Sequence, residues 1–117
     1  MAVMLYGIRN CDTMKRARAW LEEHAVPYAF HDYKSAGIER ATLEKWVAEV
    51  GWEKLLNRAG TTFRKLPPAE REPLDARRAV ALMLAHPSSI KRPVLTSGGP
   101  LLVGFDPAAY QARFAKR

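Results

Sequence analysis

The chain contains a single cysteine, Cys11, among its 117 residues. One cysteine cannot form an intramolecular disulfide, so the fold does not depend on one. The position that would complete a Cys-x-x-Cys pair is occupied by Met14, which excludes a two-cysteine redox centre within the chain. Any disulfide or adduct that Cys11 forms must therefore be resolved by a thiol from another molecule. This use of cysteine suits a reducing cytosol.

The sequence also lacks long apolar runs and the signatures of common cofactor sites. No run approaches the roughly 20 apolar residues of a membrane span, and Met1 to Tyr6 is too short for the apolar core of a signal peptide. We therefore expect a cytoplasmic protein without membrane contact. The histidines His24, His31 and His86 are scattered without metal-ligand spacing, and no glycine-rich nucleotide loop is present. We expect neither a bound metal nor a tightly bound cofactor.

The charge of the chain is strongly basic but spread out. Nineteen Lys and Arg residues against 12 Asp and Glu residues give a formal net charge of +7. The basic residues form only short pairs such as Lys15-Arg16 and Lys91-Arg92, whereas nucleic-acid-binding proteins gather them on one element with aromatic residues between. We do not expect nucleic-acid binding, and the surplus fits small anionic substrates or simple solubility.

The first part of the chain has the pattern of a strand, a helix and a second strand. The short apolar run Val3–Tyr6 predicts a strand. From Thr13, apolar residues recur at helical spacing until Pro27 stops the helix. Residues Tyr28–Tyr33 alternate large aromatic side chains with smaller or polar ones, which predicts another strand. This order predicts a βαβ unit with parallel strands.

Residues 38–86 show helical spacing and no strand pattern. A helix through Leu43 is expected to end at Gly51, a residue suited to the C-cap. Asp75 is suited to cap a further helix, which must stop before Pro87. The pair Pro67-Pro68 is expected to exclude regular structure nearby.

The end of the chain predicts a hairpin followed by a helix. Two short apolar runs, Pro93–Thr96 and Leu101–Phe105, flank the turn Ser97–Pro100, which predicts antiparallel pairing. Asp106 followed by Pro107 is typical of a helix start, with an N-cap and a proline in the first turn.

These elements together describe an α/β protein with a thioredoxin-like fold. A βαβ half and a ββα half are joined by an inserted helical subdomain. The length suits one domain with a real core and is too short for two ordinary ones. We expect a single, monomeric domain in which residues 1–37 and 88–117 form the thioredoxin-like halves and about 38–87 form the helical insertion.

Cys11 lies where the first predicted strand hands over to the first predicted helix. A helix N-terminus offers free N–H groups and the positive end of the helix dipole, which favour the reactive thiolate. Lys15 adds positive charge, whereas Asp12 opposes it because a carboxylate raises the pKa of a nearby thiol. A free cysteine is often only a small buried hydrophobic residue, but the polar neighbours of Cys11 argue against that interpretation.

Two other stretches could bind an anion. A proline before a strand in the second half of a thioredoxin-like fold is often cis and lies beside the cysteine loop. Pro93 would then place Arg92 at the same site, where a guanidinium can bind an oxyanion or a carboxylate. The alternative is a surface arginine before a strand. The stretch Asn57–Lys65 contains Arg58, a glycine and two hydroxyls, which could cradle an anion or form an ordinary helix start.

These residues together resemble the ArsC/Spx family of thioredoxin-fold proteins, and within it the YffB-like branch of arsenate reductase-like proteins. The matching stretches run nearly from end to end of the chain. They are Leu5–Thr13, Phe30–Lys34, Gly51–Glu53, Asn57–Leu66, Ile90–Pro93 and Gly104–Phe105. The resemblance implies an enzyme whose cysteine attacks an oxyanion or receives a glutathionyl group, after which glutathione and glutaredoxin complete the reduction.

The resemblance also implies roles for individual residues. Cys11 matches the nucleophile and Arg92 matches the arginine before the cis-proline, so both are expected to be catalytic. Further residues are expected to contact the substrate or glutathione: Asn10, Thr13, Lys15, Arg58, Lys91 and Pro93. Glutathione is then a co-substrate, glutaredoxin is a partner, and the substrate is a small anion or a glutathionylated thiol.

The chain departs from this family pattern at three positions. Gly7 stands where arsenate reductases carry a histidine, and Gly104 stands about where their third oxyanion-binding arginine falls. Met14 replaces the second cysteine of many Spx proteins. We therefore expect a glutathione-dependent thiol reductase, with less support for arsenate as the substrate. The alternatives are an Spx-like regulatory protein that binds RNA polymerase and a glutathione-binding protein without turnover.

Overall fold

The computed structural model describes residues 2–9 and 11–115. The chain divides into two compact units. Residues up to Asp32 together with those from Arg92 onward form the first, which we call the sheet unit. Tyr33–Lys91 form the second, which we call the helical unit. None of the helices in the described ranges combines the length and apolarity needed to cross a membrane.

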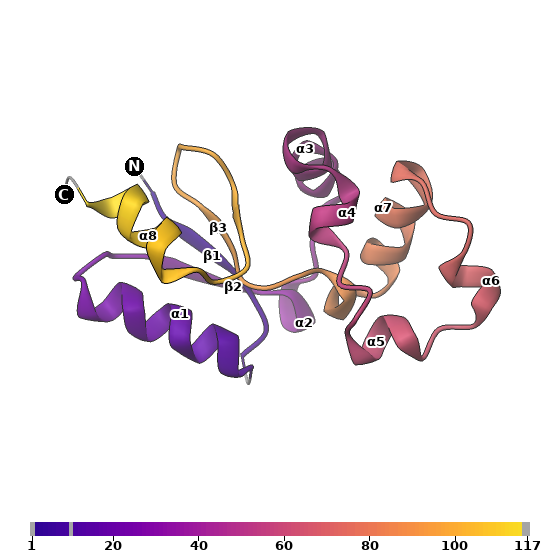
Figure 1. Ribbon diagram of the computed structural model, residues 1–117, viewed down its shortest axis with the longest axis horizontal. Helices are drawn as coiled ribbons and strands as arrows, with labels where there is room; N and C mark the ends of the chain where they lie inside the picture. Colours follow the sequence, from indigo (N-terminus) through magenta and orange to yellow (C-terminus); the bar gives the residue numbers. More distant parts are fainter. Residues whose placement is uncertain (1, 10, 116–117) are drawn as a thin grey trace. The chain divides into compact units, whose positions relative to one another are not determined.

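The sheet unit is built on a four-stranded sheet of order β2-β1-β3-β4 (Figure 1). Its strands are β1 (Met4–Gly7), β2 (Ala29–Asp32), β3 (Val94–Thr96) and β4 (Leu102–Val103). Strands β1 and β2 are parallel, because helix α1 (Asp12–Glu23) crosses between them, and the other pairs are antiparallel. The predicted βαβ unit, the hairpin and the thioredoxin-like fold are confirmed.

One face of this sheet carries the core of the unit. Leu5 lies opposite Phe30 on β2 and Leu95 on β3, so these side chains point to the same face. Helices α1 and α8 (Pro107–Phe114) cover that face (Figure 1). The buried cluster comprises Val3, Leu5, Met14, Ala17, Leu21, Val26, Leu95, Tyr110 and Phe114. The apolar side chains that recur along α1 thus pack against the sheet, and this packing holds α1 on that face.

The elements of the sheet unit have somewhat different bounds from those predicted; for example, the last strand was expected over Leu101–Phe105 but spans only Leu102–Val103. Two of the differences change the path of the chain. Helix α1 ends at Glu23, well before Pro27, because Ala25 adopts a φ of 56° and turns the chain. The second strand was expected to reach Tyr33 but ends at Asp32. Tyr33 instead begins helix α2 (Tyr33–Ala36) and is buried.

The helical unit consists of short helices that pack around α3 and α7. After α2 come α3 (Arg40–Val50), α4 (Trp52–Leu55), α5 (Thr61–Arg64), α6 (Pro68–Arg71), α7 (Ala76–Ala85) and the 3₁₀ helix η1 (Pro87–Ser89). Helix α3 contacts α7, and both bury large apolar side chains, such as Trp46 on α3 and Met83 on α7. An isolated antiparallel bridge between Leu56 and Ile90 joins the end of α4 to the segment after η1.

The predicted helix ends of the helical unit are mostly confirmed. Gly51 has a φ of 90° and ends α3, and its N–H donates to the carbonyl of Val47 at 2.8 Å. The Asp75 carboxylate caps α7 by accepting from the backbone N–H of Arg78 at 2.8 Å. The expectation for Pro67-Pro68 was wrong, because α6 begins at Pro68. A proline in the first turn of a helix sacrifices no hydrogen bond that the helix would otherwise make.

Candidate functional site

Cys11 is the N-cap residue of α1. Its backbone is extended, with φ −114° and ψ 134°, and its carbonyl accepts the first helical hydrogen bond from Lys15 at 3.0 Å. Its side chain is partly buried and packs against the core of the sheet unit. The Cys11 side chain does not cap the helix through a hydrogen bond. The N–H groups of the first turn are nevertheless close enough to stabilise a negative sulfur.

The surroundings of Cys11 favour the thiolate. Burial by itself raises the pKa of the Cys11 thiol, but the groups around it outweigh that effect. The backbone N–H of Met14, the guanidinium of Arg92 and the backbone N–H of Thr13 each favour the negative sulfur and lower its pKa. The net result is a pKa below the usual value of the thiol. A lowered pKa increases the fraction of the thiol that is present as thiolate, which is the reactive form of cysteine.

Arg92 reaches this site from the start of β3. The Arg92–Pro93 peptide bond is cis, as the sequence predicted, and Pro93 is buried. The carbonyl of Pro93 accepts a hydrogen bond from the N–H of Gly104 at 2.8 Å, which joins the segment to the end of β4. The Arg92 guanidinium lowers the pKa of Cys11 through a hydrogen bond and through its charge. The sheet unit therefore brings together Cys11 and Arg92, which are 81 residues apart in the sequence.

The structure explains why glycine is present at the two positions, 7 and 104, where the chain departs from the family pattern. A β-carbon on Gly7 would lie 2.2 Å from Sδ of Met14, so Met14 occupies the space that a side chain at position 7 needs. Gly104 has a φ of 82°, a conformation in which an arginine would be strained. The absence of a side chain at Gly7 thus makes room for Met14. The left-handed backbone of Gly104 belongs to the segment whose N–H donates to the carbonyl of Pro93.

The other predicted residues of the sheet unit take less direct positions. Thr13 contributes its backbone N–H. Lys15 is exposed on α1, and it is not one of the groups that lower the pKa of Cys11. Asn10 was also predicted to contact the substrate, but it lies outside the described residues. The backbone N–H of Met14 lowers the pKa of Cys11. The sequence did not single out this residue for such a role, because its side chain indicates only that a second cysteine is missing.

Arg58 and Lys91 belong to the helical unit. Arg58 is exposed, and its Cζ lies 5.5 Å from the centroid of the Trp52 ring. The N–H of Lys91 donates to the carbonyl of Leu55 at 2.7 Å, so its backbone is held beside the end of α4. Nothing local in the sequence indicates that the Trp52 ring is the one that Arg58 contacts.

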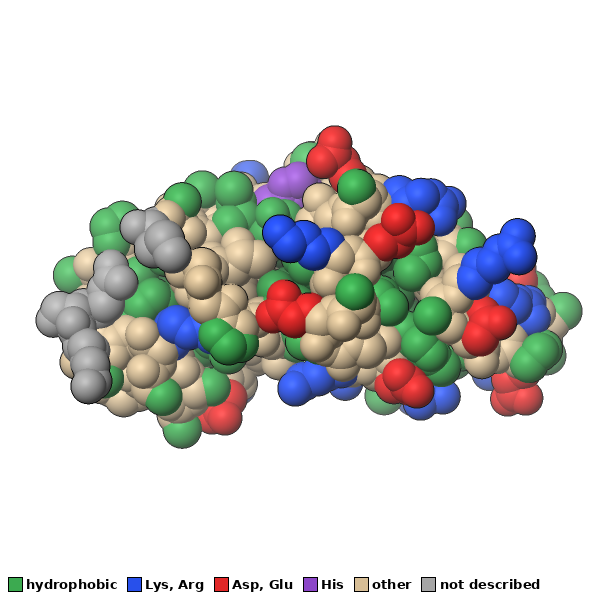
Figure 2. Space-filling view, turned by 90° about the horizontal axis from the view of Figure 1, so that it is seen from above, with side chains coloured by type: hydrophobic (Ala, Val, Ile, Leu, Met, Phe, Trp, Pro, Cys, Tyr) green, Lys and Arg blue, Asp and Glu red, His purple; other side chains and the backbone are tan. Residues whose placement is uncertain are grey.

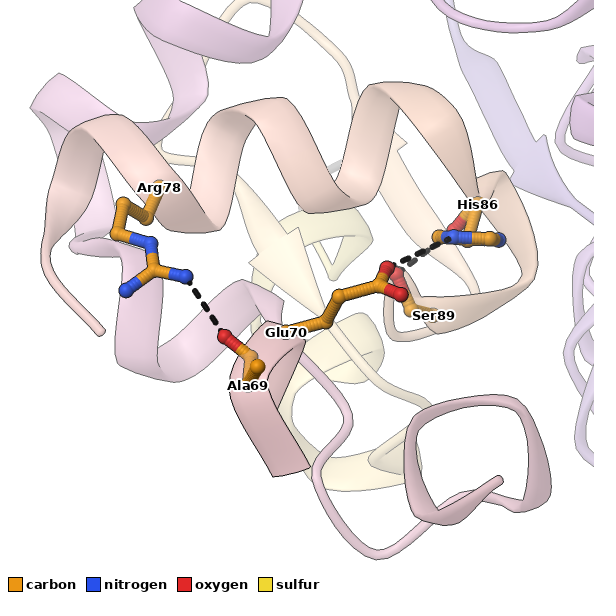
Figure 3. Close-up of polar contacts among 5 residues, drawn as sticks. All are labelled: Ala69, Glu70, Arg78, His86 and Ser89. Atoms are coloured by element: carbon orange, nitrogen blue, oxygen red, sulfur yellow. Dashed lines mark hydrogen bonds and ion pairs between the residues drawn. The ribbon is translucent and has the colours of Figure 1, made fainter. Parts of the chain in front are cut away.

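The helical unit also has an open pocket of about 230 Å³ against α7, lined by Glu70, Arg78, Ala81, Leu82, Ala85 and His86. Arg78 donates to the carbonyls of Ala69 and Pro73 at 2.9 and 2.8 Å. The side chain of Glu70 extends along α7, and its Oε1 lies 4.0 Å from Nε2 of His86 (Figure 3). These polar groups hold α6 against α7, so their evident role is structural.

The described residues contain no group of three potential ligands that could hold a metal ion. His24 stacks on Trp20 with ring centroids 3.7 Å apart, and His31 packs against Tyr6 at 4.9 Å. On the face shown in Figure 2, basic side chains are interspersed with acidic ones. That face therefore has no broad basic patch of the kind that binds nucleic acid.

Comparison with known proteins identifies the family. The model of the ArsC family matches residues 6–113. A solved structure named YFFB is 61% identical, with a TM-score of 0.92, and the match covers 95% of this chain and 97% of that one. An arsenate reductase (ArsC) related protein from Brucella melitensis is 59% identical with a TM-score of 0.77, over 97% of this chain and 95% of that one.

Two curated relatives extend the comparison. An uncharacterized protein of Haemophilus influenzae is 37% identical, over 97% of this chain and 99% of its own length. The global transcriptional regulator Spx of Listeria innocua is 27% identical, over 89% of this chain and 80% of its own length. The family model spans nearly the whole chain and includes both Cys11 and Arg92. The chain therefore belongs to the ArsC family.

Proposed function

We propose that the protein is a glutathione-dependent thiol reductase with Cys11 as its only nucleophile. The observation that carries the proposal is the position of Cys11 at the start of α1, where backbone N–H groups and Arg92 lower its pKa. A lowered pKa increases the thiolate fraction near neutral pH, and the thiolate is the species that attacks disulfides. The membership in the ArsC family and the likeness to an arsenate reductase-related protein support this class of chemistry.

The proposed cycle uses two thiol–disulfide exchanges. The Cys11 thiolate attacks the glutathionyl sulfur of a mixed disulfide, forms a Cys11–glutathione disulfide and expels the substrate sulfur as a thiolate, which takes up a proton. The thiolate of a second glutathione, or of glutaredoxin, then attacks the glutathionyl sulfur and releases Cys11. With glutathione, the products are the reduced substrate and glutathione disulfide. The net change transfers the disulfide bond from the substrate sulfur to the sulfur of the incoming glutathione, so one glutathione thiol is consumed for each substrate thiol released.

Arg92 has two functions in this proposal. Its guanidinium stabilises the Cys11 thiolate before attack, and it binds an anionic group of the incoming partner afterwards. Backbone groups of Thr13 and the Pro93 segment are proposed to orient the glutathionyl group. Contacts from Lys15, Asn10, Lys91 and Arg58 to the anionic partner are proposed from the resemblance alone. Glutathione acts as a co-substrate, and no tightly bound cofactor takes part.

Turnover on a panel of substrates tests the proposal. A glutathionylated peptide and arsenate are each supplied with glutathione, with and without glutaredoxin, and reduction is followed by NADPH consumption through glutathione reductase. We expect the glutathionylated peptide to be reduced and Cys11→Ser to abolish the activity. A folded wild-type protein that reduces neither substrate contradicts an enzymatic role. Reduction of arsenate alone would assign the chemistry to the oxyanion rather than to the mixed disulfide.

The likeness to Spx supports one rival function of a different class. A relative named as a global transcriptional regulator aligns over 89% of this chain. Under this rival the protein binds RNA polymerase and Cys11 has no redox role. Affinity capture with purified polymerase distinguishes the two. Stable binding that is unaffected by Cys11→Ser, in a protein without thiol reductase activity, favours the regulator. A protein that binds glutathione but neither turns over nor binds polymerase is the remaining alternative.

A further inference from the structure

Helix α1 starts without the polar cap that begins α7 and α8. Asp75 caps α7 by accepting from the N–H of Arg78 at 2.8 Å, and Asp106 caps α8 by accepting from the N–H of Ala108 at 3.1 Å. In α1 the N-cap position is occupied by Cys11, whose side chain makes no capping hydrogen bond. The first turn of α1 therefore lacks the polar anchor that an aspartate gives to a helix start.

Met14 gives this turn an apolar anchor instead. Its side chain is fully buried in the core cluster of the sheet unit. The thioether lies directly over the backbone of Gly7 at the end of β1, since a β-carbon on that glycine would be 2.2 Å from Sδ and 2.6 Å from Cε. An unbranched, flexible side chain suits so narrow a space. The contact joins the first turn of α1 to the end of β1.

The end of β1 is itself fixed by the strands on both sides. Gly7 pairs with Asp32 on β2, and the preceding residue, Tyr6, pairs with Val94 on β3. Val94 begins β3 two residues after Arg92. The strand that supports the first turn of α1 is thus hydrogen-bonded to the strand that follows Arg92. One sheet therefore positions both the N–H donors and the guanidinium that act on Cys11.

We propose that Met14 is a positioning residue whose side chain, packed on Gly7, holds the backbone N–H groups of Thr13 and Met14 toward Sγ of Cys11. This inference rests on the role of Cys11 as the nucleophile in the proposed function. A sulfur accepts hydrogen bonds well only as a thiolate, and it loses that charge when it forms a mixed disulfide. The packed thioether keeps the first turn in place in both states. The thiolate that leaves the mixed disulfide is therefore released into a site already arranged to stabilise it.

The pH dependence of iodoacetamide labelling of Cys11 tests this inference. We expect Met14→Ala to shift the labelling midpoint to higher pH, because the first turn of α1 loses its support. Met14→Leu keeps most of the buried volume and should stay close to the wild type. Leu21→Ala is the matched control, because Leu21 is fully buried in the same cluster near the other end of α1 and its truncation also leaves a cavity. It should lower the stability of the protein without moving the labelling midpoint.

A second background shows whether Met14 acts through the backbone N–H groups. Met14→Ala should shift the midpoint to higher pH in an Arg92→Ala protein as well, because the proposed effect does not pass through the guanidinium. The absence of that shift would overturn the inference. An unchanged midpoint in a folded Met14→Ala protein, or an equal shift in Leu21→Ala, would also overturn it.

Circular dichroism and unfolding in urea establish that each variant is folded under the labelling conditions. Met14→Val removes less of the side chain and is measured where Met14→Ala does not fold, with a shift in the same direction expected and an unchanged midpoint again contradicting the inference. Labelling needs no glutathione. A protein that follows these expectations but reduces no glutathionylated peptide would therefore contradict the proposed function and leave the positioning role of Met14 intact.

Discussion

Replacing Gly7 with alanine tests how tightly the cysteine helix is packed on β1. The new β-carbon would lie 2.2 Å from Sδ and 2.6 Å from Cε of Met14, far inside a normal carbon contact. Met14 is fully buried, so its side chain can move only by displacing other core atoms. Overpacking of this kind destabilises a protein by about 1–3 kcal/mol. For a chain of this length, each kcal/mol lowers Tm by roughly 4 °C.

The same substitution should also change the pKa of Cys11. Met14 moves with the first turn of α1, and its backbone N–H is the first of the groups that lower the pKa of Cys11. We therefore expect Gly7→Ala to raise the pKa of Cys11, measured by the pH dependence of iodoacetamide labelling. Gly37→Ala is the control. Gly37 has a φ of 66° and nothing near its missing β-carbon, so this variant should lose stability through backbone strain alone and leave the pKa of Cys11 unchanged.

A cycle with Met14→Ala separates the clash from other effects. Met14→Ala alone should destabilise the protein by about 2–5 kcal/mol through the cavity that it leaves. In the Gly7→Ala background the loss should be smaller, because the clash disappears with the thioether. Unfolding in urea gives the free energies. A Gly7→Ala protein with unchanged Tm, or strictly additive losses in the double variant, would refute the close packing of Met14 on Gly7.

Two single contacts and the pKa of Cys11 can be tested in the same way. Arg113 donates to Oγ of Ser97 at 2.6 Å and to the carbonyl of Pro100, so Arg113→Ala should speed amide hydrogen exchange in the β3–β4 turn, and unchanged exchange would refute this clamp. Asp75→Ala removes the α7 cap and should lower the free energy of unfolding by about 0.5–2 kcal/mol, with Asp75→Asn retaining most of it, whereas equal losses in both would contradict capping. The pKa of Cys11 is lower in the folded protein than in the unfolded one. The thiolate therefore stabilises the fold at pH values above the pKa of the unfolded state, and this stabilisation is lost as the pH falls through the pKa of the folded state. The stability advantage of wild type over Cys11→Ser should therefore grow from pH 6 to pH 9, and a constant difference would contradict the pKa shift.

The elements of the fold were predictable where the signals are local. Gly51, Asp75 and the Asp106-Pro107 pair mark helix ends through their own backbone preferences, and the structure confirms them. The error at Pro68 has the same origin, because one property of proline both breaks a helix interior and suits a helix start. The early end of α1 depends on a left-handed alanine, Ala25, which no local pattern indicates.

The candidate site was predictable only in part. The position of Cys11 at a strand-to-helix junction follows from the sequence, and its proximity to Arg92 follows from the fold. The packing of Met14 on Gly7 and the contact of Arg58 with Trp52 do not, because each depends on tertiary structure rather than on neighbouring residues. The sequence also suggested that Lys15 activates the thiol, whereas the groups that lower the pKa are Arg92 and backbone N–H groups.

The proposed chemistry depends on the activation of Cys11 by the start of α1 and by Arg92. The most direct measurement is the pH dependence of the Cys11 thiolate, followed by its ultraviolet absorbance against Cys11→Ser as the blank. We expect a midpoint below the value of about 8.5 for a free cysteine, and a shift of that midpoint to higher pH in Arg92→Ala. A wild-type midpoint at or above the free value, or a midpoint that Arg92→Ala leaves in place, would contradict this activation.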